Sequence, residues 1–246
     1  MSRVVVIGAT GHIGTYLVPR LVRAGHEVVA VSRGSREPYV PAPEWKQVER
    51  VVADRDAEDA AGTFGARIAA LRPDAVVDLV CFTPESAQQL VDALRPTRPL
   101  LLHCGTIWVH GRVATVPVTE DDPRTAYGEY GIHKARIEAL LHRETLAGGV
   151  PAIVLHPGHI TGPWVSITPA GNRDLDVWRR LATGEPLALP GLGMGVLNHV
   201  HGDDASIDRA RTVLGYRPRY TSLEALRDSL RALVADGRAD IGGQPV

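Results

Sequence analysis

A short apolar run followed at once by a glycine-rich turn opens the chain and constrains its fold more than any other feature. Arg3–Ile7 has the β-branched composition of a strand that is buried on both faces. Gly8-Ala9-Thr10-Gly11-His12-Ile13-Gly14 follows, and apolar residues then recur at helical spacing up to Gly25. Glycines in this turn let a phosphate group approach the N-terminus of the helix and let the helix pack on the strand. The pattern therefore predicts a strand–turn–helix unit that binds a phosphate-containing ligand.

Strands and helices alternate along the next 130 residues. The further apolar runs that predict strands are 27–32, 47–53, 74–80, 99–104 and 152–155. The segments with helical spacing are His12–Ala24, Glu58–Leu71, Pro84–Leu94 and Tyr130–Leu146. This alternation predicts an α/β fold with a doubly wound parallel sheet of the Rossmann type. Pro and Gly become frequent after about Pro157, so we expect a dinucleotide-binding domain over residues 1–157 and a smaller substrate-side region over 158–246.

Composition excludes several classes of function. The 246 residues suffice for one large α/β domain or for a cofactor domain with a small appendage. With 27 basic and 28 acidic residues and 5% aromatics, the chain lacks the charge and the stacking platform of a nucleic-acid binder. No apolar stretch approaches the ~18–20 residues that span a bilayer, so we expect no membrane association and a cytoplasmic protein. Cys81 and Cys104 lack CxxC spacing, which argues against a disulfide framework or a zinc site.

The end of the second predicted strand bears on the choice of nicotinamide cofactor. A carboxylate there binds the ribose 2′-hydroxyl of NAD, whereas an arginine accommodates the 2′-phosphate of NADP. The sequence has Arg33 and Arg36 and no acid before Glu37, which favours NADP. NAD stays open as the alternative, because 25 of the 27 basic residues are arginine and two solvated loop arginines are unsurprising. Asp54, at the end of the third strand, is either a partner of the adenine amino group or a turn residue that faces water.

Tyr130 and Lys134 lie four residues apart and therefore share one face of a predicted helix. A phenol titrates near pH 10, and an adjacent cation lowers its pKa toward the working range of a proton-transferring group. The chain has only two lysines, Lys46 and Lys134, so a lysine at this position is informative. Thr106 follows the fifth predicted strand, where parallel sheets bind their ligands, and lies 24 residues before Tyr130. We expect its hydroxyl to orient a substrate oxygen against Tyr130.

In the order of these motifs the chain resembles the extended short-chain dehydrogenase/reductases, also called NAD-dependent epimerase/dehydratases. The resemblance covers residues 3–163, including the segment Leu155-His156-Pro157-Gly158-His159-Ile160-Thr161-Gly162-Pro163. It resumes at Ser206–Leu233, where residues 210–218 are similar to the C-terminal signature of the family. Segments 31–34, 54–56 and 76–79 are similar to a subgroup that includes the chloroplast stem-loop-binding proteins.

The resemblance implies a role for each matching residue. Tyr130 would be the acid/base, Lys134 would bind the nicotinamide ribose and Thr106 would position the carbonyl. The expected cofactor-binding residues are Gly8, Thr10, Gly11, His12, Ile13, Gly14, Arg33, Arg36, Asp54, Arg55, Leu79, Val80, Cys81, Pro157, His159 and Ile160. The expected substrate-binding residues are Trp108, His110 and Trp164. Family members commonly form homodimers through helices that match Pro84–Leu94 and Tyr130–Leu146, so we expect a homodimer.

The sequence also departs from the family pattern. Ile107 and Trp108 occupy the places of the Asp-Glu pair that follows the catalytic threonine of nucleotide-sugar 4,6-dehydratases, which makes that elimination chemistry improbable. His110 precedes Gly111 where the family usually has tyrosine, and His156 stands where an arginine is common before the proline. Near Asp204–Ser206 several tens of residues of the family pattern are absent, through deletion or because a stretch is missing from the sequence, so we expect a shortened substrate-side region.

The sequence thus predicts an enzyme, an NADP-dependent oxidoreductase that moves a hydride between nicotinamide and a small-molecule carbonyl or alcohol. Two alternatives stay open: a nucleotide-sugar epimerase with tightly held cofactor, and a non-catalytic cofactor-binding protein with an RNA-associated or regulatory role. The intact Tyr130 and Lys134 pair and the absence of a basic excess count against the second. His199, His201 and Asp203 lack a further ligand at a defined spacing, so we expect no metal site.

Overall fold

The computed structural model describes residues 1–111, 118–161, 174–188, 211–212, 215, 217 and 221–243. The chain divides into two compact units. The first contains residues 1–111 and 124–156, and the second contains 112–123 and 157–246.

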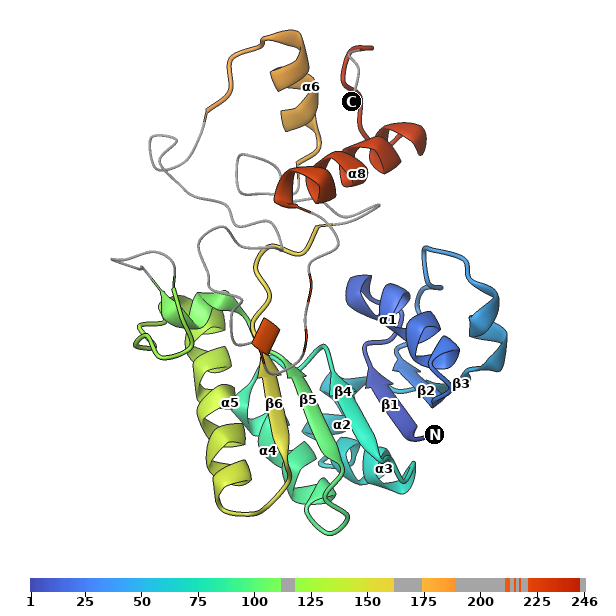
Figure 1. Ribbon diagram of the computed structural model, residues 1–246, viewed down its shortest axis with the longest axis vertical. Coiled ribbons are helices and arrows are strands. Elements are labelled where there is room, and N and C mark those ends of the chain that lie inside the picture. The colour runs from blue at the N-terminus through green and yellow to red at the C-terminus, as the bar shows by residue number, and fades with distance from the viewer. Residues whose placement is uncertain are drawn as a thin grey trace. The chain divides into compact units, whose positions relative to one another are not determined.

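A six-stranded sheet forms the centre of the first unit (Figure 1). Its strands are β1 (Arg3–Ile7), β2 (Glu27–Ser32), β3 (Glu49–Val52), β4 (Ala75–Asp78), β5 (Leu100–Cys104) and β6 (Ala152–Leu155). All neighbours pair in parallel, in the order β3-β2-β1-β4-β5-β6. The order reverses between β1 and β4, where sheets of this kind open a crevice for a ligand. The prediction of a parallel Rossmann-type sheet is confirmed.

Helices cover both faces of this sheet. They are α1 (His12–Arg23), η1 (Pro43–Gln47), α2 (Arg55–Ala60), α3 (Phe64–Ala70), α4 (Pro84–Leu94), η2 (Ile107–His110) and α5 (Gly128–Leu146). Val18 of α1 and Trp45 of η1 pack on one face, against the side chains of β1 and β2. Phe64, Leu90 and Ile137 of α3, α4 and α5 pack on the other. The two apolar layers fix the C-terminal ends of the strands, from which the site is built.

Several predicted boundaries differ from those of the structure, and two of the differences have a clear local cause. The segment expected as one helix over 58–71 forms α2 and α3, with a break after Ala60. Gly62 has φ +68°, a left-handed conformation that ends a helix rather than continuing it. The third strand begins at Glu49 rather than Gln47, because the preceding residues form η1.

The second unit contributes two described helices, α6 (Asp176–Thr183) and α8 (Ser222–Ala235). Thr221 caps α8 in a reciprocal capping box with Glu224, which satisfies two N-terminal backbone donors. Leu233 of this helix is buried. Trp164 and the histidines at 199 and 201 lie outside the described residues, as does the shortened segment near 204–206. Within the described ranges, every helix is too short or too polar to cross a membrane.

Candidate active site

The glycine turn between β1 and α1 has the shape of a phosphate cradle. Gly8 adopts φ +84°, and a Cβ at this position would lie 2.7 Å from the Val80 side chain. A Cβ at Gly14 would lie 2.2 Å from the carbonyl oxygen of Ala9, so only glycine lets the helix pack this closely. Among the described residues, no side chain caps the N-terminus of α1, and its first turn holds no acid. This leaves a positive helix end of the kind that binds a pyrophosphate.

A cavity of about 190 Å³ extends from this turn along the C-terminal ends of β1 and β2. It is lined by Ile7, Gly8, Thr10, Gly11, Val31, Ser32, Arg33, Ser35, Arg36, Ala53, Arg55, Asp56, Phe64, Val80 and Phe82. Its position is the one at which open parallel sheets bind a dinucleotide. The lining combines the glycine turn, three hydroxyls, three arginines, one carboxylate and an apolar floor, and these residues fit a dinucleotide.

Arg33 and Arg36 lie at the exposed edge of this cavity. Within the part of the chain that the structure describes, neither guanidinium has an ion-pair or hydrogen-bond partner. The nearby acid Glu37 does not neutralise them, because it binds Arg50 at 2.7 Å. Ser32 and Ser35 line the cavity beside them. The two arginines therefore form a positive edge with uncompensated charge.

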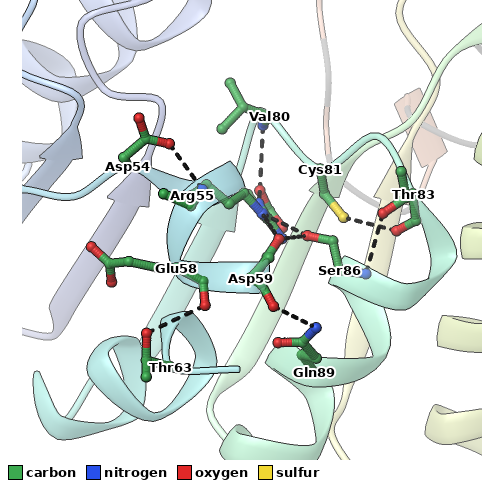
Figure 2. Close-up of polar contacts among 12 residues, drawn as sticks. Asp54, Arg55, Glu58, Asp59, Thr63, Val80, Cys81, Thr83, Ser86 and Gln89 are labelled. Atoms are coloured by element: carbon green, nitrogen blue, oxygen red, sulfur yellow. Dashed lines mark hydrogen bonds and ion pairs between the residues drawn. The ribbon is translucent and has the colours of Figure 1, made fainter. Parts of the chain in front are cut away.

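Arg55, by contrast, is held inside the wall of the cavity and is only 7% exposed (Figure 2). Its Nη1 binds Asp78 at 2.7 Å, and its Nε donates to Ser86 at 2.8 Å. Asp59 lies 3.4 Å from the same Nε and also accepts from the Ser86 hydroxyl. Burial disfavours charge on Asp78, yet Arg55 and His103 hold the pKa of this carboxyl below its usual range. Four side chains from α2, β4 and α4 thus form one buried polar network.

This network positions the loop after β4. Asp78 accepts from the backbone N–H of Val80 at 3.3 Å, and Val80 is the residue that packs over Gly8. The backbone N–H of Leu79 continues the sheet by donating to Ile7. Cys81 is fully buried beside this loop, and burial raises the pKa of its thiol to about 12. Of the three loop residues expected to flank the cofactor, Val80 lines the cavity.

Two other expected cofactor contacts have partners in the protein. Asp54 precedes α2 and caps it, accepting from the backbone N–H of Ala57 at 3.2 Å. His12 begins α1, and its Nδ1 meets the Tyr39 hydroxyl while the two rings stack at 5.8 Å. Their contact with a cofactor stays a prediction.

Thr106, Tyr130 and Lys134 come together at the C-terminal end of β5. The Thr106 hydroxyl accepts from the backbone N–H of Trp108 at 3.3 Å, and it lies near enough to the Tyr130 phenol to influence the pKa of that group through hydrogen bonding. Lys134, in the next turn of α5, is 2% exposed and donates from Nζ to the carbonyl oxygen of Cys104 at 2.7 Å. Its Nζ lies 6.0 Å from the centre of the Tyr130 ring. The convergence predicted from their spacing is present.

One electrostatic expectation is wrong for this structure. Burial raises the pKa of Tyr130, and the hydrogen bond with Thr106 only partly opposes it. Lys134 does not lower this pKa here, because its ammonium faces the carbonyl of Cys104 rather than the phenol oxygen. Burial also lowers the pKa of Lys134. At neutral pH, Tyr130 is therefore a protonated phenol, the form that donates a proton.

Aromatic residues surround the Tyr130 ring. Phe82 lies 6.4 Å from it and Trp108 contacts it edge-on at 6.3 Å, while Trp108 also stacks on Tyr127. All four rings are more than 40% exposed. His110, also expected to bind substrate, is buried with its ring 6.3 Å from that of His156. The Tyr130 phenol therefore lies among exposed aromatic side chains.

Two charged residues near this site were not singled out from the sequence. Glu138 lies one turn beyond Lys134 on α5, and Arg124 binds its carboxylate at 2.8 Å. Glu138 also meets Nε2 of His156 at 3.2 Å. The spacing of four residues from Lys134 was a signal for Glu138, whereas nothing local marks Arg124.

The remaining expected residues stand in the second unit. Pro157, His159 and Ile160 begin it, and the carbonyl of His159 accepts from Thr161 at 3.3 Å. Trp164 lies outside the described residues. Their contacts with cofactor or substrate stay predictions.

Comparison with known proteins adds an independent result. Residues 4–206 match the family profile described as "NAD dependent epimerase/dehydratase family". The chain is 30% identical over 220 residues to a 2'-dehydrokanamycin reductase of Streptomyces kanamyceticus, with 86% of this chain and 60% of that protein covered. It is 29% identical over 185 residues to a UDP-glucose 4-epimerase of Azospirillum brasilense, with 69% and 51% covered. The chain therefore spans between 51% and 60% of the length of these two relatives.

Solved structures share the fold at low sequence identity. The enzyme WbmG of Bordetella bronchiseptica, in complex with NAD, has a TM-score of 0.71 at 17% identity, covering 98% of this chain and 96% of its own. A UDP-glucose 4-epimerase of Thermotoga maritima has a TM-score of 0.74 at 17% identity, with 95% and 99% covered.

Proposed function

Because the chain belongs to the NAD dependent epimerase/dehydratase family, we propose that it is an NADPH-dependent oxidoreductase that reduces a small-molecule carbonyl. The observation that carries this proposal is the convergence of Thr106 and Tyr130 at the end of β5, with the buried ammonium of Lys134 beside them. A hydroxyl and a phenol at one point are suited to bind a carbonyl oxygen and to protonate it.

The raised pKa of Tyr130 favours the reductive direction. When bound, the nicotinamide supplies the hydride. Thr106 holds the carbonyl oxygen, and Tyr130 donates its proton to that oxygen as charge develops on it. Lys134 holds its buried ammonium 6.0 Å from the centre of the Tyr130 ring. It is also suited to donate to a ribose hydroxyl as a compact cation.

The choice of NADPH rests on the edge of the cavity. Arg33 and Arg36 have no carboxylate partner among the described residues, and Ser32 and Ser35 add hydroxyl donors beside them. Two arginines with hydroxyls match a dianionic phosphate group better than a ribose hydroxyl. NAD remains the alternative, since the solved WbmG structure contains it.

A second candidate is epimerisation through a keto intermediate, with the cofactor retained. Relatives named as UDP-glucose 4-epimerases favour it. The two activities differ in stoichiometry: reduction consumes one NADPH per product, whereas epimerisation consumes none. A non-catalytic, RNA-associated role is the weakest candidate, and salt-sensitive RNA binding without cofactor would revive it.

We also propose that the chain forms a homodimer through α4 and α5. The family resemblance is the support for this arrangement. Light scattering on the purified protein distinguishes a dimer from a monomer, because a particle of about 26.5 kDa is the monomer and contradicts the proposed dimer.

The test of the enzymatic proposal measures cofactor binding and turnover separately. Fluorescence titration with NADPH and with NADH reports binding. NADPH oxidation with aromatic aldehydes, α-diketones and ketosugars then reports reduction. Tyr130→Phe should bind NADPH as the unchanged chain does and lose turnover by about 10²–10⁴-fold, the usual contribution of a general acid. Binding of neither cofactor contradicts the proposal, and so does undiminished turnover in Tyr130→Phe.

A further inference from the structure

The imidazole of His156 contacts the backbone of Thr106 rather than any part of the cavity. Its Nδ1 lies 3.1 Å from the amide nitrogen of Thr106 and 2.9 Å from the carbonyl oxygen of the same residue. The two residues are fifty positions apart in the chain. Gly105 makes the contact possible, because a Cβ there would lie 2.7 Å from Nδ1 of His156.

The other side of the imidazole is held by a charged pair. Nε2 lies 3.2 Å from Glu138, and Arg124 binds both oxygens of that carboxylate. Although burial raises the pKa of Glu138, hydrogen bonds from His156 and Arg124 bring it to about 2. Glu138 is therefore a carboxylate at neutral pH, a group that only accepts hydrogen bonds. It follows that Nε2 of His156 carries a hydrogen and donates a hydrogen bond to the Glu138 carboxylate.

This assignment leaves Nδ1 to bind Thr106 in either protonation state. In the neutral ring, Nδ1 accepts from the Thr106 N–H, and in the charged ring it donates to the Thr106 carbonyl. The other titratable groups that face the ring are His110, at 6.3 Å between ring centres, and His103. Both the neutral and the charged ring therefore have a contact with the backbone of Thr106.

We propose that His156 is a positioning residue for the reaction: held by Glu138 and Arg124, it fixes the backbone of Thr106 and thereby the hydroxyl that meets Tyr130. This inference rests on the proposed function, since Thr106 matters to turnover only if it orients a substrate carbonyl. A displacement of about 1 Å at such a group lowers a rate by up to about 10²-fold. A partly exposed charged pair whose other contact is a backbone amide still holds the imidazole from both sides, and such support limits displacement of the group it carries.

Two matched substitutions test the contacts of the two ring nitrogens of His156 one at a time. In His156→Asn, the side-chain amide occupies the place of Nδ1, so the contact with Thr106 is kept and the contact with Glu138 is lost. In His156→Gln, the amide occupies the place of Nε2, so the Glu138 contact is kept and the Thr106 contact is lost. If His156 acts through Thr106, kcat for NADPH-dependent reduction should fall at least about tenfold in the Gln variant and by less than about threefold in the Asn variant. KM for NADPH should be unchanged in both, because the cavity is not touched.

The reverse order, with His156→Gln fully active and His156→Asn impaired, overturns the proposal and assigns His156 to the Glu138 pair alone. Equal activity of both variants with the unchanged chain also overturns it. Thermal unfolding of both variants detects a folding defect.

A readout independent of turnover keeps this inference separable from the proposed function. Hydrogen exchange at the Thr106 amide, followed by NMR, should be slow in the unchanged chain and in His156→Asn, and at least about tenfold faster in His156→Gln. Should the unchanged chain bind NADPH yet reduce no carbonyl, the enzymatic proposal fails, while slow exchange at Thr106 still supports the anchor. Because only the neutral ring accepts from the Thr106 N–H, exchange is measured at alkaline pH, and rapid exchange there in the unchanged chain overturns the anchor whatever the activity.

Discussion

The two ends of the dinucleotide cavity hold arginines in opposite environments. Arg55 is buried in the wall, where Asp78, Ser86 and Asp59 surround its guanidinium (Figure 2). Arg33 and Arg36 lie at the exposed edge, with no carboxylate among the described residues to neutralise them. A charge that is already compensated supports the wall, whereas an uncompensated charge is available to a ligand. We therefore expect substitutions in the wall to change stability and substitutions at the edge to change affinity.

The largest effect should follow from removing the counter-charge of Arg55. Asp78→Asn leaves a buried guanidinium without its closest carboxylate and should lower the free energy of unfolding by about 3–5 kcal/mol. Urea denaturation measures this. The matched control is Glu37→Gln, which removes the carboxylate from the exposed pair with Arg50 and should cost less than about 1 kcal/mol. Equal losses of unfolding free energy in the two variants would show that burial of the ion pair does not determine its contribution to stability.

The pH dependence of stability should come from the same wall. His103 pairs in register with Asp78, and burial lowers the pKa of its imidazole to about 4. Because the unfolded chain binds a proton near pH 6.5 and the folded chain does not, stability is complete above pH 6.5 and is lost as the pH falls toward 4. The loss should be on the order of 3 kcal/mol, and His103→Gln should flatten the profile over this window. If the unfolding free energy of His103→Gln depends on pH as steeply as that of the unchanged chain, His103 is not the source of the pH dependence.

At the exposed edge, the double change Arg33→Ala and Arg36→Ala should weaken NADPH binding by about 10–100-fold, which corresponds to about 1.4–2.7 kcal/mol. NADH affinity and the free energy of unfolding should stay the same, since neither arginine is tied to the fold. Fluorescence titration with both cofactors checks this. An equal loss of affinity for NADPH and for NADH would mean that these two arginines do not bind the 2′-phosphate.

The smallest effect concerns one uncharged side chain within the wall. Ser86→Ala removes the hydroxyl that accepts from Arg55 at 2.8 Å and donates to Asp59, and we expect a loss of about 1.5 kcal/mol in unfolding free energy. Ser35→Ala, at the edge, is the control and should leave stability unchanged. A loss as large as that of Asp78→Asn would indicate that the wall depends on the whole network rather than on the ion pair.

Much of the fold was readable from local patterns. The strand from Arg3 to Ile7, the glycine turn and the helix Pro84–Leu94 were predicted with their observed bounds or nearly so. Periodicity and turn residues act between neighbours in the chain, so the sequence exposes them directly. The break at Gly62 was missed because helical spacing continues on both sides of it, and only the φ of that glycine ends the first helix.

The candidate site was also predicted in part from local patterns and in part not. Spacing along one helix was sufficient to pair Tyr130 with Lys134, and position after a parallel strand was sufficient to add Thr106. Spacing did not reveal where the ammonium of Lys134 points, so the expected lowering of the Tyr130 pKa was wrong. A pKa depends on burial and on the direction of nearby donors, and both are set by packing.

The sequence by itself determined the parallel sheet, the glycine turn between β1 and α1, and the placement of Tyr130 and Lys134 on one helix, because each depends on residues close together in the chain. Only the tertiary structure decided which arginine is buried and which is exposed, and which backbone His156 supports. Arg55 meets Asp78 across 23 residues, and His156 meets Thr106 across 50. Contacts over such separations form only when the sheet and its helices pack, and burial then decides whether a charge stabilises the fold or is available to a ligand.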